Sequence, residues 1–466
     1  MRRASLSGVV QPDTATLAPG MRVLVLTAPV GEGHVAAARA LSEGILRRNP
    51  EAEITNVDAL SALPALLRWV VSDAYRWQLR AAPWLFGVVF GVLRRSALLR
   101  RLIRAGLSLA GSRRLLQVLR LHRSDVVVST WPVATTILGC LRLRGKVRTP
   151  VCATITDFAG LELWADKGVD LHLVMHESLV PKVERLAGRD SARHVALLVT
   201  GEFLAPRSSA DARRALDLPE TGLVVVVSGG GWAVGDLSGA VATALRLADS
   251  TVLCLAGRDE ETRARISCAF AEEPRVRVLG FTDRMSDLLA AADVLVHSTG
   301  GVTSLEALAR GCPVVAYGAP PGHSPLLARE MASLGLVSHA RSTNELESAL
   351  RAPTRSRWDI DLAAGVDAAS LVLSVTPRVV APLQSRLARP AAMIASAAAL
   401  VIAFLASDLT TPLNWLRCPD GSGSNAHSQL ARPPRFSPTR FYPACSAPKS
   451  RAEHQVIARG ARRVES

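Results

Sequence analysis

The sequence predicts an α/β protein with two Rossmann-like lobes that face a cleft, on three observations. First, short runs rich in Val and Leu alternate with helical stretches, which is the pattern of parallel sheets covered by helices on both faces. Second, this alternation stops at a polar stretch near residues 203–220 and then starts again. Third, each half opens with a strand that runs into a glycine loop, and ligands of such sheets bind at the carboxyl ends of the strands.

The elements follow in order along the chain of 466 residues. Residues 1–20 are expected to form a flexible arm. A signal peptide is not expected there, because Arg2 and Arg3 are followed by no apolar segment of the kind that it needs. The first lobe covers 21–203, with strands expected at Val23–Thr27, Ile54–Asp58, Asp125–Thr130, Val151–Asp157, Leu171–Met175 and Val195–Thr200. The second lobe covers 204–376, with strands expected at Leu223–Ser228, Thr251–Ala256, Arg275–Leu279, Ala292–His297 and Pro313–Tyr317.

Residues 63–123 do not fit the alternation. They hold twelve arginines against one acid, Asp73, interleaved with Trp, Tyr and Phe, and they carry most of the chain's net charge of +15. Guanidinium groups beside aromatic rings suit a helix that lies at an anionic membrane surface. An ordinary helical insertion with a solvated basic face is the alternative. Nucleic acid is not an expected partner, because no recognition motif accompanies the charge.

The tail, residues 377–466, contains an uncharged stretch at 390–407. Its eighteen residues are just enough to span a bilayer as a helix, but they are rich in alanine, so a single membrane helix and a buried or interfacial helix both stay open. Residues 418–466 are rich in Pro, Ser and Arg, which predicts disorder.

The glycine loop of the first lobe, Gly31-Glu32-Gly33-His34, leaves backbone amides at the start of a helix, where an anion or a polar sugar could sit. With Ala36 it also satisfies a Gly-x-Gly-x-x-Ala dinucleotide pattern, and Asp58 closes the next strand as a ribose-binding acid would. That match is weak, and a fuller nucleotide site is predicted in the second lobe.

The second lobe places glycines after several successive strands. Gly229, Gly230 and Gly231 follow the first of them and let a pyrophosphate approach the main chain. The later loops carry Gly257-Arg258, Gly280-Phe281 to Met285, and Gly300-Gly301-x-Thr303-x-x-Glu306. In the last of these, a helix start offers amides to phosphate, and a carboxylate one turn later can accept both ribose hydroxyls.

This series, with Asp293 and Gly311-x-Pro313, resembles the donor lobe of family 28 glycosyltransferases. The Gly-x-Gly-His loop, Asp58, and Thr156-Asp157 with Trp164 and Asp170 resemble the acceptor lobe of the monogalactosyldiacylglycerol synthase and processive diacylglycerol glucosyltransferase group. The enzyme that forms peptidoglycan lipid II by transferring N-acetylglucosamine is a relative of that group. The resemblance covers about residues 21–350.

The resemblance implies the GT-B architecture, a UDP-sugar donor, inversion at the anomeric carbon and a lipid acceptor such as diacylglycerol at the cytoplasmic face of the plasma membrane. Membrane attachment is then peripheral or through the single C-terminal helix. By matching position it places the uracil near Phe281 and Met285, the ribose on Glu306, and the donor sugar beside His323. It places the diphosphate on a set of loop residues, namely Gly229, Gly230, Gly231, Gly301 and Thr303.

The resemblance implies a transferase that needs no metal and no further cofactor. Amides, helix dipoles and Arg258 would then stabilise the charge of the departing UDP. An acceptor hydroxyl must lose a proton as it attacks, and the candidates for the base are Asp157 and His34. We favour Asp157 as the base and His34 as its positioning partner; a loop cap and a turn histidine are the structural alternatives.

The sequence departs from these families at two places. Relatives commonly carry a histidine between positions 157 and 164, where Glu162 is the ionisable residue here, and His323 replaces their usual amide or acid. The identity of the donor hexose therefore stays open. Two other functions also stay open, a UDP-sugar 2-epimerase of the same fold and a non-catalytic partner that binds a UDP-sugar or a lipid.

Overall fold

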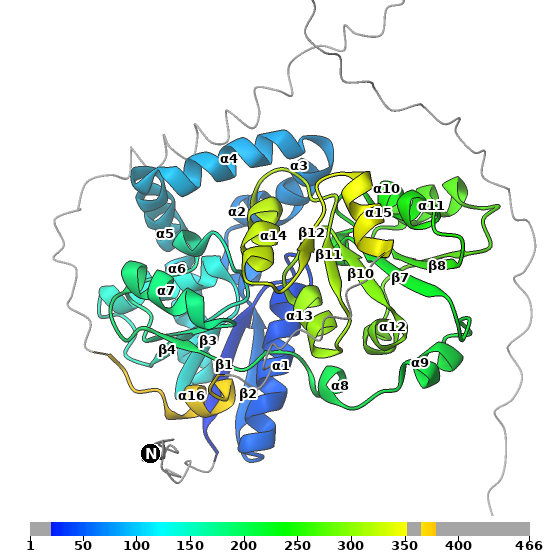
Figure 1. The fold of residues 1–466 in the computed structure, drawn as a ribbon. Helices are drawn as coiled ribbons and strands as arrows, with labels where there is room; N and C mark the ends of the chain where they lie inside the picture. Colours follow the sequence, from blue (N-terminus) through cyan, green and yellow to red (C-terminus); the bar gives the residue numbers. More distant parts are fainter. Residues whose placement is uncertain (1–19, 352–364, 379–466) are drawn as a thin grey trace, which may run out of the picture. The chain divides into compact units, whose positions relative to one another are not determined.

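A computed structural model describes residues 20–351 and 365–378 of the chain (Figure 1). These residues form two parallel six-stranded sheets, one in each expected lobe, so the predicted α/β class with two Rossmann-like halves is confirmed. The expected apolar helix at 390–407 and the tail beyond it lie outside the described residues. Within the described part, no helix combines the length and the apolar character that crossing a bilayer requires.

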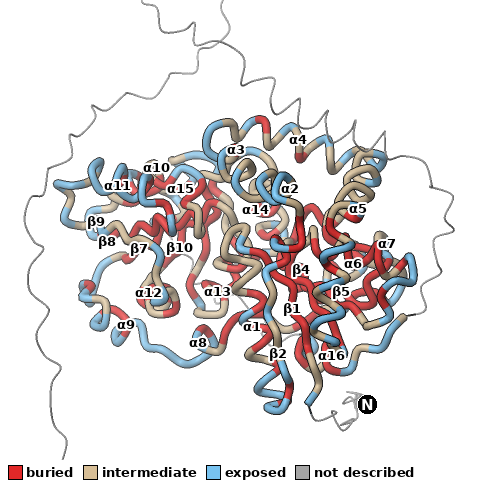
Figure 2. Tube along the Cα trace, turned by 180° about the vertical axis from the view of Figure 1, so that it is seen from behind, coloured by how far each residue is buried: buried red, intermediate tan, exposed pale blue. Residues whose placement is uncertain are grey.

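The first sheet has the strand order β2-β1-β3-β4-β5-β6, and all neighbours are parallel. Val23 and Val25 of β1 are completely buried, as expected of a strand that helices cover on both faces (Figure 2). The strands are β1 (Arg22–Thr27), β2 (Glu53–Asp58), β3 (Val126–Ser129), β4 (Val151–Ile155), β5 (Leu171–Val174) and β6 (Ala192–His194). The helices around it are α1 (Gly33–Arg48), α6 (Pro132–Leu143) and α7 (Val180–Ala187), with short turns η1 (Ala59–Ala62), η3 (Leu161–Leu163) and η4 (Glu177–Leu179).

The second sheet has the order β12-β11-β10-β7-β8-β9 and is again parallel throughout. Its strands are β7 (Leu223–Ser228), β8 (Ser250–Leu255), β9 (Val276–Leu279), β10 (Val294–His297), β11 (Val314–Ala316) and β12 (Ser338–His339). Its helical elements are α9 (Ser209–Ala215), η5 (Gly230–Trp232), α10 (Leu237–Ala244), α11 (Glu260–Ala269), α12 (Met285–Ala291), α13 (Val302–Ala309), α14 (His323–Ser333) and α15 (Thr343–Arg351).

The prediction of a strand at 195–200 is wrong. The sixth strand, β6, ends at His194, and the following residues connect the lobes as an extended segment that leads to α8 (Gly201–Leu204). Leu198 and Val199 are buried there, because their side chains enter an apolar cluster between the lobes. A run of buried apolar residues has the same sequence pattern whether it lies in a sheet or in such a connection.

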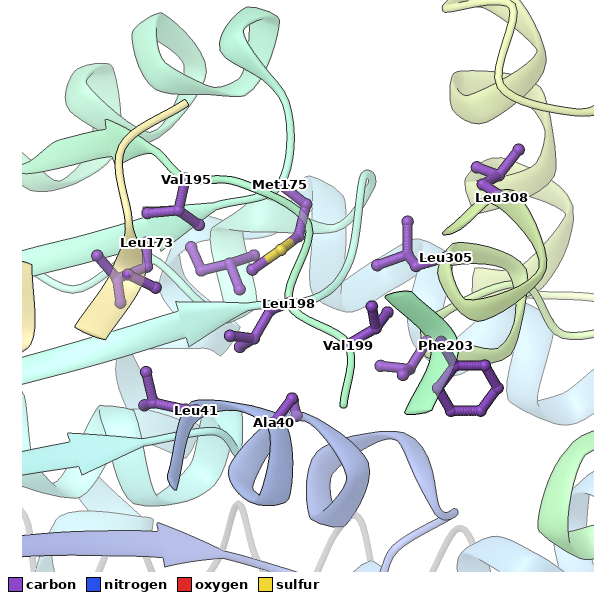
Figure 3. Close-up of a cluster of buried hydrophobic side chains, with 14 of the residues drawn as sticks. Ala40, Leu41, Leu173, Met175, Val195, Leu198, Val199, Phe203, Leu305 and Leu308 are labelled. Atoms are coloured by element: carbon purple, nitrogen blue, oxygen red, sulfur yellow. The ribbon is translucent and has the colours of Figure 1, made fainter. Parts of the chain in front are cut away.

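This apolar cluster is continuous from one lobe to the other (Figure 3). Ala40 of α1 and Met175 contribute from the first lobe, and Leu305 of α13 contributes from the second. Val199 of the connecting segment lies between them in the close-up, and Phe203 lies below Leu305. The lobes are therefore joined by side-chain packing as well as by the chain itself.

Residues 365–378 return to the first lobe. Helix α16 (Ala368–Ser374) packs on α1, with Ala368, Ala369 and Val372 buried. Val366 forms an isolated parallel bridge with Val195. The expected second lobe, 204–376, therefore includes a segment whose apolar face packs on the first lobe.

The basic segment 63–123 is helical. It consists of α2 (Ala65–Trp69), the π-helical turn η2 (Val70–Ala74), α3 (Tyr75–Ala81), α4 (Pro83–Arg95) and α5 (Ala97–His122). Nine of the thirteen exposed large apolar side chains of the described part belong to it. Two of its arginines form ion pairs instead: half-buried Arg104 pairs with Asp166, and Arg80, which stays exposed, pairs with Asp259 of the second lobe.

Candidate functional site

Each sheet has one point where the order of its strands reverses. In the first sheet it lies between β1 and β3, and in the second sheet between β7 and β10. Chains that leave such a pair of strands turn to opposite faces and open a crevice at the carboxyl ends, where ligands of these sheets bind. The loops after β1, β7 and β10 carry the glycines that the sequence singled out.

The loop after β1 turns at Gly31, whose φ of +69° is the left-handed conformation that glycine adopts readily. Gly33 and His34 then begin α1. The Thr130 hydroxyl, from the loop after β3, donates a 3.0 Å hydrogen bond to the backbone carbonyl of His34. Both loops of this switch point therefore hold the start of α1 in place.

The imidazole of His34 lies against the indole of Trp164, with ring centroids 5.6 Å apart. Its Nδ1 atom is buried and has no hydrogen-bond partner among the described residues. Burial lowers the pKa of His34, and the nearby charge of Asp157 opposes that effect without cancelling it. The ring is therefore neutral at neutral pH and has one nitrogen free to bind a ligand hydroxyl.

Asp157 lies just beyond the end of β4 and faces both lobes. Its Oδ2 atom accepts a 2.8 Å hydrogen bond from Trp164 Nε1. His323 Nε2, from the first residue of α14 in the second lobe, lies 3.5 Å from the same oxygen. The structure thus brings together His34, Asp157 and His323, which the sequence singled out separately.

The first glycine loop of the second lobe is tightly packed. A Cβ atom on Gly229 would lie 2.6 Å from the backbone of Ala233 and Val234, so only glycine fits there. Buried His297 ties this loop to the next one, with Nδ1 2.9 Å from the Ser228 carbonyl and Nε2 2.9 Å from the Gly300 carbonyl. Gly230 amide nitrogen donates to Ser228 Oγ at 3.2 Å.

Arg258 connects three parts of the site. Its backbone amide donates to the Gly231 carbonyl at 2.9 Å, and its guanidinium stands 3.5 Å from the centre of the Phe281 ring. Its Nε atom donates a 2.9 Å hydrogen bond to Oε1 of Glu32 in the loop after β1. Phe281 is half exposed, and Met285 begins α12 four residues later.

The glycine loops of the two lobes are in direct contact. A Cβ atom on Gly231 would lie 2.5 Å from Cγ of Glu32, and one on Gly33 would lie 3.6 Å from Val302 of α13. The Glu32 carboxylate therefore occupies space beside Gly231 and Arg258. The sequence predicts that a diphosphate binds at this place. The Glu32 carboxylate leaves little space for it there.

Helix α13 starts at the same edge. Gly300 and Gly301 precede it with φ of +70° and +71°, and Thr303 lies in its first turn. Glu306 lies one turn further along, where burial, reinforced by the charge of Glu202, raises its pKa to about 8, against a smaller opposing effect of Arg39. The charged residues near Glu306 are thus Glu202 of the connecting helix α8 and Arg39 of helix α1 in the first lobe.

The basic segment covers the site. The Tyr75 ring lies 5.2 Å from Phe86 and 5.7 Å from Trp232, and Phe90 meets His323 edge-on at 5.3 Å. Burial, followed by the charge of Asp157, raises the pKa of Tyr75, so its phenol stays protonated. Helices α3 and α4 therefore contact the donor-side loops as well as the first lobe (Figure 1).

Several site residues were not found by the sequence argument, namely Glu32, Tyr75, Trp232 and His297. Trp232 directly follows the glycine run and Glu32 stands inside the first loop, so proximity to a motif was the available signal. Two residues quoted for the resemblance have structural roles. Asp58 caps η1 by accepting the Leu60 amide at 2.9 Å, which removes the acid from the dinucleotide interpretation, and buried Asp170 pairs with Arg142.

The described residues contain no group of three or more His, Cys, Asp or Glu side chains arranged to hold a metal ion. The charged groups at the predicted diphosphate position are Arg258 and Glu32, and the glycine loops lie beside them.

In comparison with known proteins, each lobe matches a family model. Residues 34–193 match the model of the monogalactosyldiacylglycerol (MGDG) synthase family, and residues 232–352 match that of glycosyl transferases group 1. The predicted relationship to glycosyltransferases, and to the MGDG synthase group in particular, is confirmed.

Curated relatives include the processive diacylglycerol beta-glucosyltransferases of Bacillus licheniformis and Bacillus subtilis. The first is 23% identical over 215 residues, 46% of this chain and 56% of the relative; the second is 22% identical over 305 residues, 65% of this chain and 78% of the relative. The chloroplastic monogalactosyldiacylglycerol synthase 1 of Arabidopsis thaliana is 25% identical over 323 residues, covering 64% of this chain and 58% of that protein. The chain thus matches little more than half the length of two of these relatives.

Similar solved structures include Acinetobacter baumannii MurG, at a TM-score of 0.44 and 15% identity, covering 77% of this chain and 96% of that one. The spinosyn rhamnosyltransferase SpnG gives a TM-score of 0.49 at 17% identity and covers 76% and 99% of the two chains.

Proposed function

We propose that this chain, whose two lobes match glycosyltransferase models, transfers a hexose from a UDP-sugar to a membrane lipid such as diacylglycerol, with inversion at the anomeric carbon. One observation carries the proposal. Asp157 and His34 of the first lobe meet His323 of the second lobe, and the glycine loops of the two lobes are in contact. The names of the relatives, which act on diacylglycerol, support the acceptor class.

The reaction is a single displacement. Asp157 takes the proton of the acceptor hydroxyl, and the hydroxyl oxygen forms a bond to the anomeric carbon of the donor sugar. The bond between that carbon and the β-phosphate oxygen breaks, and UDP leaves with the electron pair. Attack from the face opposite to the leaving group inverts the configuration. Neutral His34, with its free Nδ1 atom, is placed to bind the acceptor hydroxyl or the donor sugar beside Asp157.

The donor groups follow from the second-lobe loops. The amides of Gly229–Gly231 and the start of α13 at Gly300, Gly301 and Thr303 bind the diphosphate, with Arg258 as the counter-charge. Phe281 and Met285 bind the uracil, and Glu306 binds the ribose. This arrangement needs no metal ion, so activity should survive EDTA; loss of activity on chelation and its return with a divalent cation would contradict the metal-free proposal.

The basic segment is the proposed membrane contact. Trp69, Trp77 and Trp84 are each more than half exposed and lie among its arginines. Indole rings at the acyl boundary and guanidinium groups at lipid phosphates suit peripheral attachment to an anionic leaflet, here assigned to the cytoplasmic face. Helices α3 and α4 also contact the residues around His323 and Trp232. A lipid acceptor bound at these helices would therefore reach Asp157 without leaving the membrane surface.

The test is turnover on vesicles. Purified protein is incubated with UDP-glucose, UDP-galactose or UDP-N-acetylglucosamine and with phosphatidylglycerol vesicles that contain diacylglycerol, and released UDP and glycolipid mass are measured. We expect glycolipid with at least one donor, and for Asp157→Asn a loss of kcat of about 100-fold or more with UDP binding retained. Vesicles without diacylglycerol are the control.

Other outcomes identify other functions. Isomerised UDP-N-acetylglucosamine in the absence of lipid would show a 2-epimerase. UDP binding without turnover of any donor, across the lipid panel, would show a non-catalytic binding protein.

A further inference from the structure

Two ring nitrogens approach one carboxylate oxygen of Asp157. Trp164 Nε1 donates to Oδ2 at 2.8 Å, and His323 Nε2 lies 3.5 Å from the same atom. Trp164 belongs to the first lobe and His323 to the second. Among the described residues no hydrogen bond reaches the other oxygen, Oδ1.

The surroundings of His323 decide which ring nitrogen carries its proton. Nε2 lies 3.3 Å from the backbone carbonyl of Ala159 as well as near the Asp157 carboxylate, and both of these groups only accept hydrogen bonds. Nε2 must therefore be the protonated nitrogen.

Both rings are fixed by packing. The indole of Trp164 is 3% exposed and lies against His34, while Phe90 of α4 meets the His323 ring edge-on. A Cβ atom on Gly160 would lie 3.2 Å from Phe90 and 3.4 Å from His323, so glycine at this position lets the histidine approach. The two N–H groups are therefore held in their directions without help from a ligand.

We propose that Trp164 and His323 are positioning residues that hold Oδ2 of Asp157 between them and leave Oδ1 to take the proton of the acceptor hydroxyl. This inference rests on the proposed function. One donor comes from each lobe, so the carboxylate is fully oriented only when the second lobe is in contact with the first. The base is thereby linked to the lobe that holds the sugar donor.

The charges around this carboxylate are few. The titratable groups that face Asp157 are His34 at the start of α1, Tyr75 of α3 and His323 itself. Burial lowers the pKa of His34 and raises that of Tyr75, so both are neutral at neutral pH. The ring nitrogens of Trp164 and His323 are therefore the polar groups in contact with this carboxylate.

The experiment compares the pH dependence of kcat/KM for the lipid acceptor in the full chain and in four variants. His323→Leu and Trp164→Phe remove one donor each, and His323→Gln restores an N–H donor without a titrating ring. His339→Gln is the matched control, since His339 lies in the same lobe and its charged neighbours are Arg341, Arg329 and Glu345.

We expect the acidic limb of the profile to move upward by about half to one pH unit in His323→Leu and in Trp164→Phe, because each lost donor makes the ionised carboxylate less favourable. His323→Gln should return the limb toward the wild-type position, and the control should not move it. A rise in donor KM with an unmoved limb in His323→Leu would overturn the proposal, because His323 would then serve the donor sugar alone.

A second measurement does not need turnover. In 15N-labelled protein, the histidine ring spectrum should show His323 protonated at Nε2, and its Nε2 resonance should shift in Asp157→Asn. A proton on Nδ1, or a spectrum that Asp157→Asn leaves unchanged, would overturn the pair. If no donor and lipid combination gives turnover, the proposed function fails while this measurement still decides whether the pair exists.

Discussion

Glu32 is the residue that most directly affects the proposed diphosphate site. Its carboxylate pairs with Arg258 and fills the space beside Gly231, where a diphosphate is proposed to bind. Both side chains are partly solvated, so the pair itself adds only about 0–1 kcal/mol to stability. The ion pair matters for ligand binding instead, because a diphosphate and the Glu32 carboxylate would compete for the Arg258 guanidinium.

The first prediction therefore concerns Glu32→Gln. Removing the competing negative charge should tighten UDP binding by about threefold to tenfold, measured by calorimetry, with little change in Tm. Glu273→Gln is the control, because Glu273 also pairs with an arginine of the second lobe, Arg275. Unchanged or weaker UDP binding in Glu32→Gln would mean that Glu32 belongs to the donor site instead of competing with the donor.

The second prediction concerns Glu306 and pH. Burial raises its pKa from 4.5 to about 8, so between these values the folded protein keeps a proton that the unfolded chain releases. Stability must then fall as pH rises through that window. Glu306→Gln cannot ionise, so its Tm relative to wild type should increase from pH 5 to pH 9.

This difference can be measured by thermal melts across the pH range. Glu260→Gln serves as the control, since Glu260 is largely exposed and pairs only with its helix neighbour Arg263 among the described contacts. Parallel curves of Tm against pH for wild type and Glu306→Gln would show that ionisation of the Glu306 carboxyl does not destabilise the folded protein.

At the scale of elements, the basic segment has two different faces. Phe86, Phe90 and Tyr75 pack inward on the site, whereas Trp69, Trp77 and Trp84 point to solvent. The inward face explains why the segment lies over both lobes, and the outward face is a set of large apolar side chains that are more than half exposed. Such a surface is unusual for a monomeric soluble protein and suits a membrane interface.

The third prediction follows from the outward face. The triple variant Trp69→Ser, Trp77→Ser, Trp84→Ser should bind phosphatidylglycerol vesicles about tenfold more weakly or worse in flotation assays, while its UDP affinity stays the same. Leu46→Ser, which changes an exposed leucine of α1, is the control. If all of these proteins bind vesicles equally well, the segment is a solvated insertion and membrane contact lies elsewhere.

At the scale of the whole molecule, the continuous apolar cluster makes the two lobes one folding unit. Leu305 is 1% exposed and contacts this cluster from the second lobe, while residues 365–378 return to the first lobe. Separation of the lobes would expose the buried side chains of both sides and of the connecting segment, which is unfavourable.

The fourth prediction is that the chain unfolds in one cooperative thermal transition. Leu305→Ala should lower the free energy of unfolding by about 2–5 kcal/mol, the usual cost of a large cavity in a core. Leu121→Ala, at a position 78% exposed, should change it by less than about 0.5 kcal/mol. Two separate transitions, with only one of them sensitive to Leu305→Ala, would show that the lobes unfold independently.

The sequence by itself determined the two parallel sheets, the glycine loops after their strands and the helical nature of the basic segment, because alternation of apolar runs and glycine positions are local properties. It did not determine the role of residues 195–200, since a buried run has the same pattern in a strand and in a connection between lobes. Only the tertiary structure placed His323 beside Asp157, Glu32 against Arg258 and Tyr75 against Trp232. These contacts join residues that are far apart in the chain, and their existence depends on how the lobes and the basic segment pack together, which no local pattern encodes.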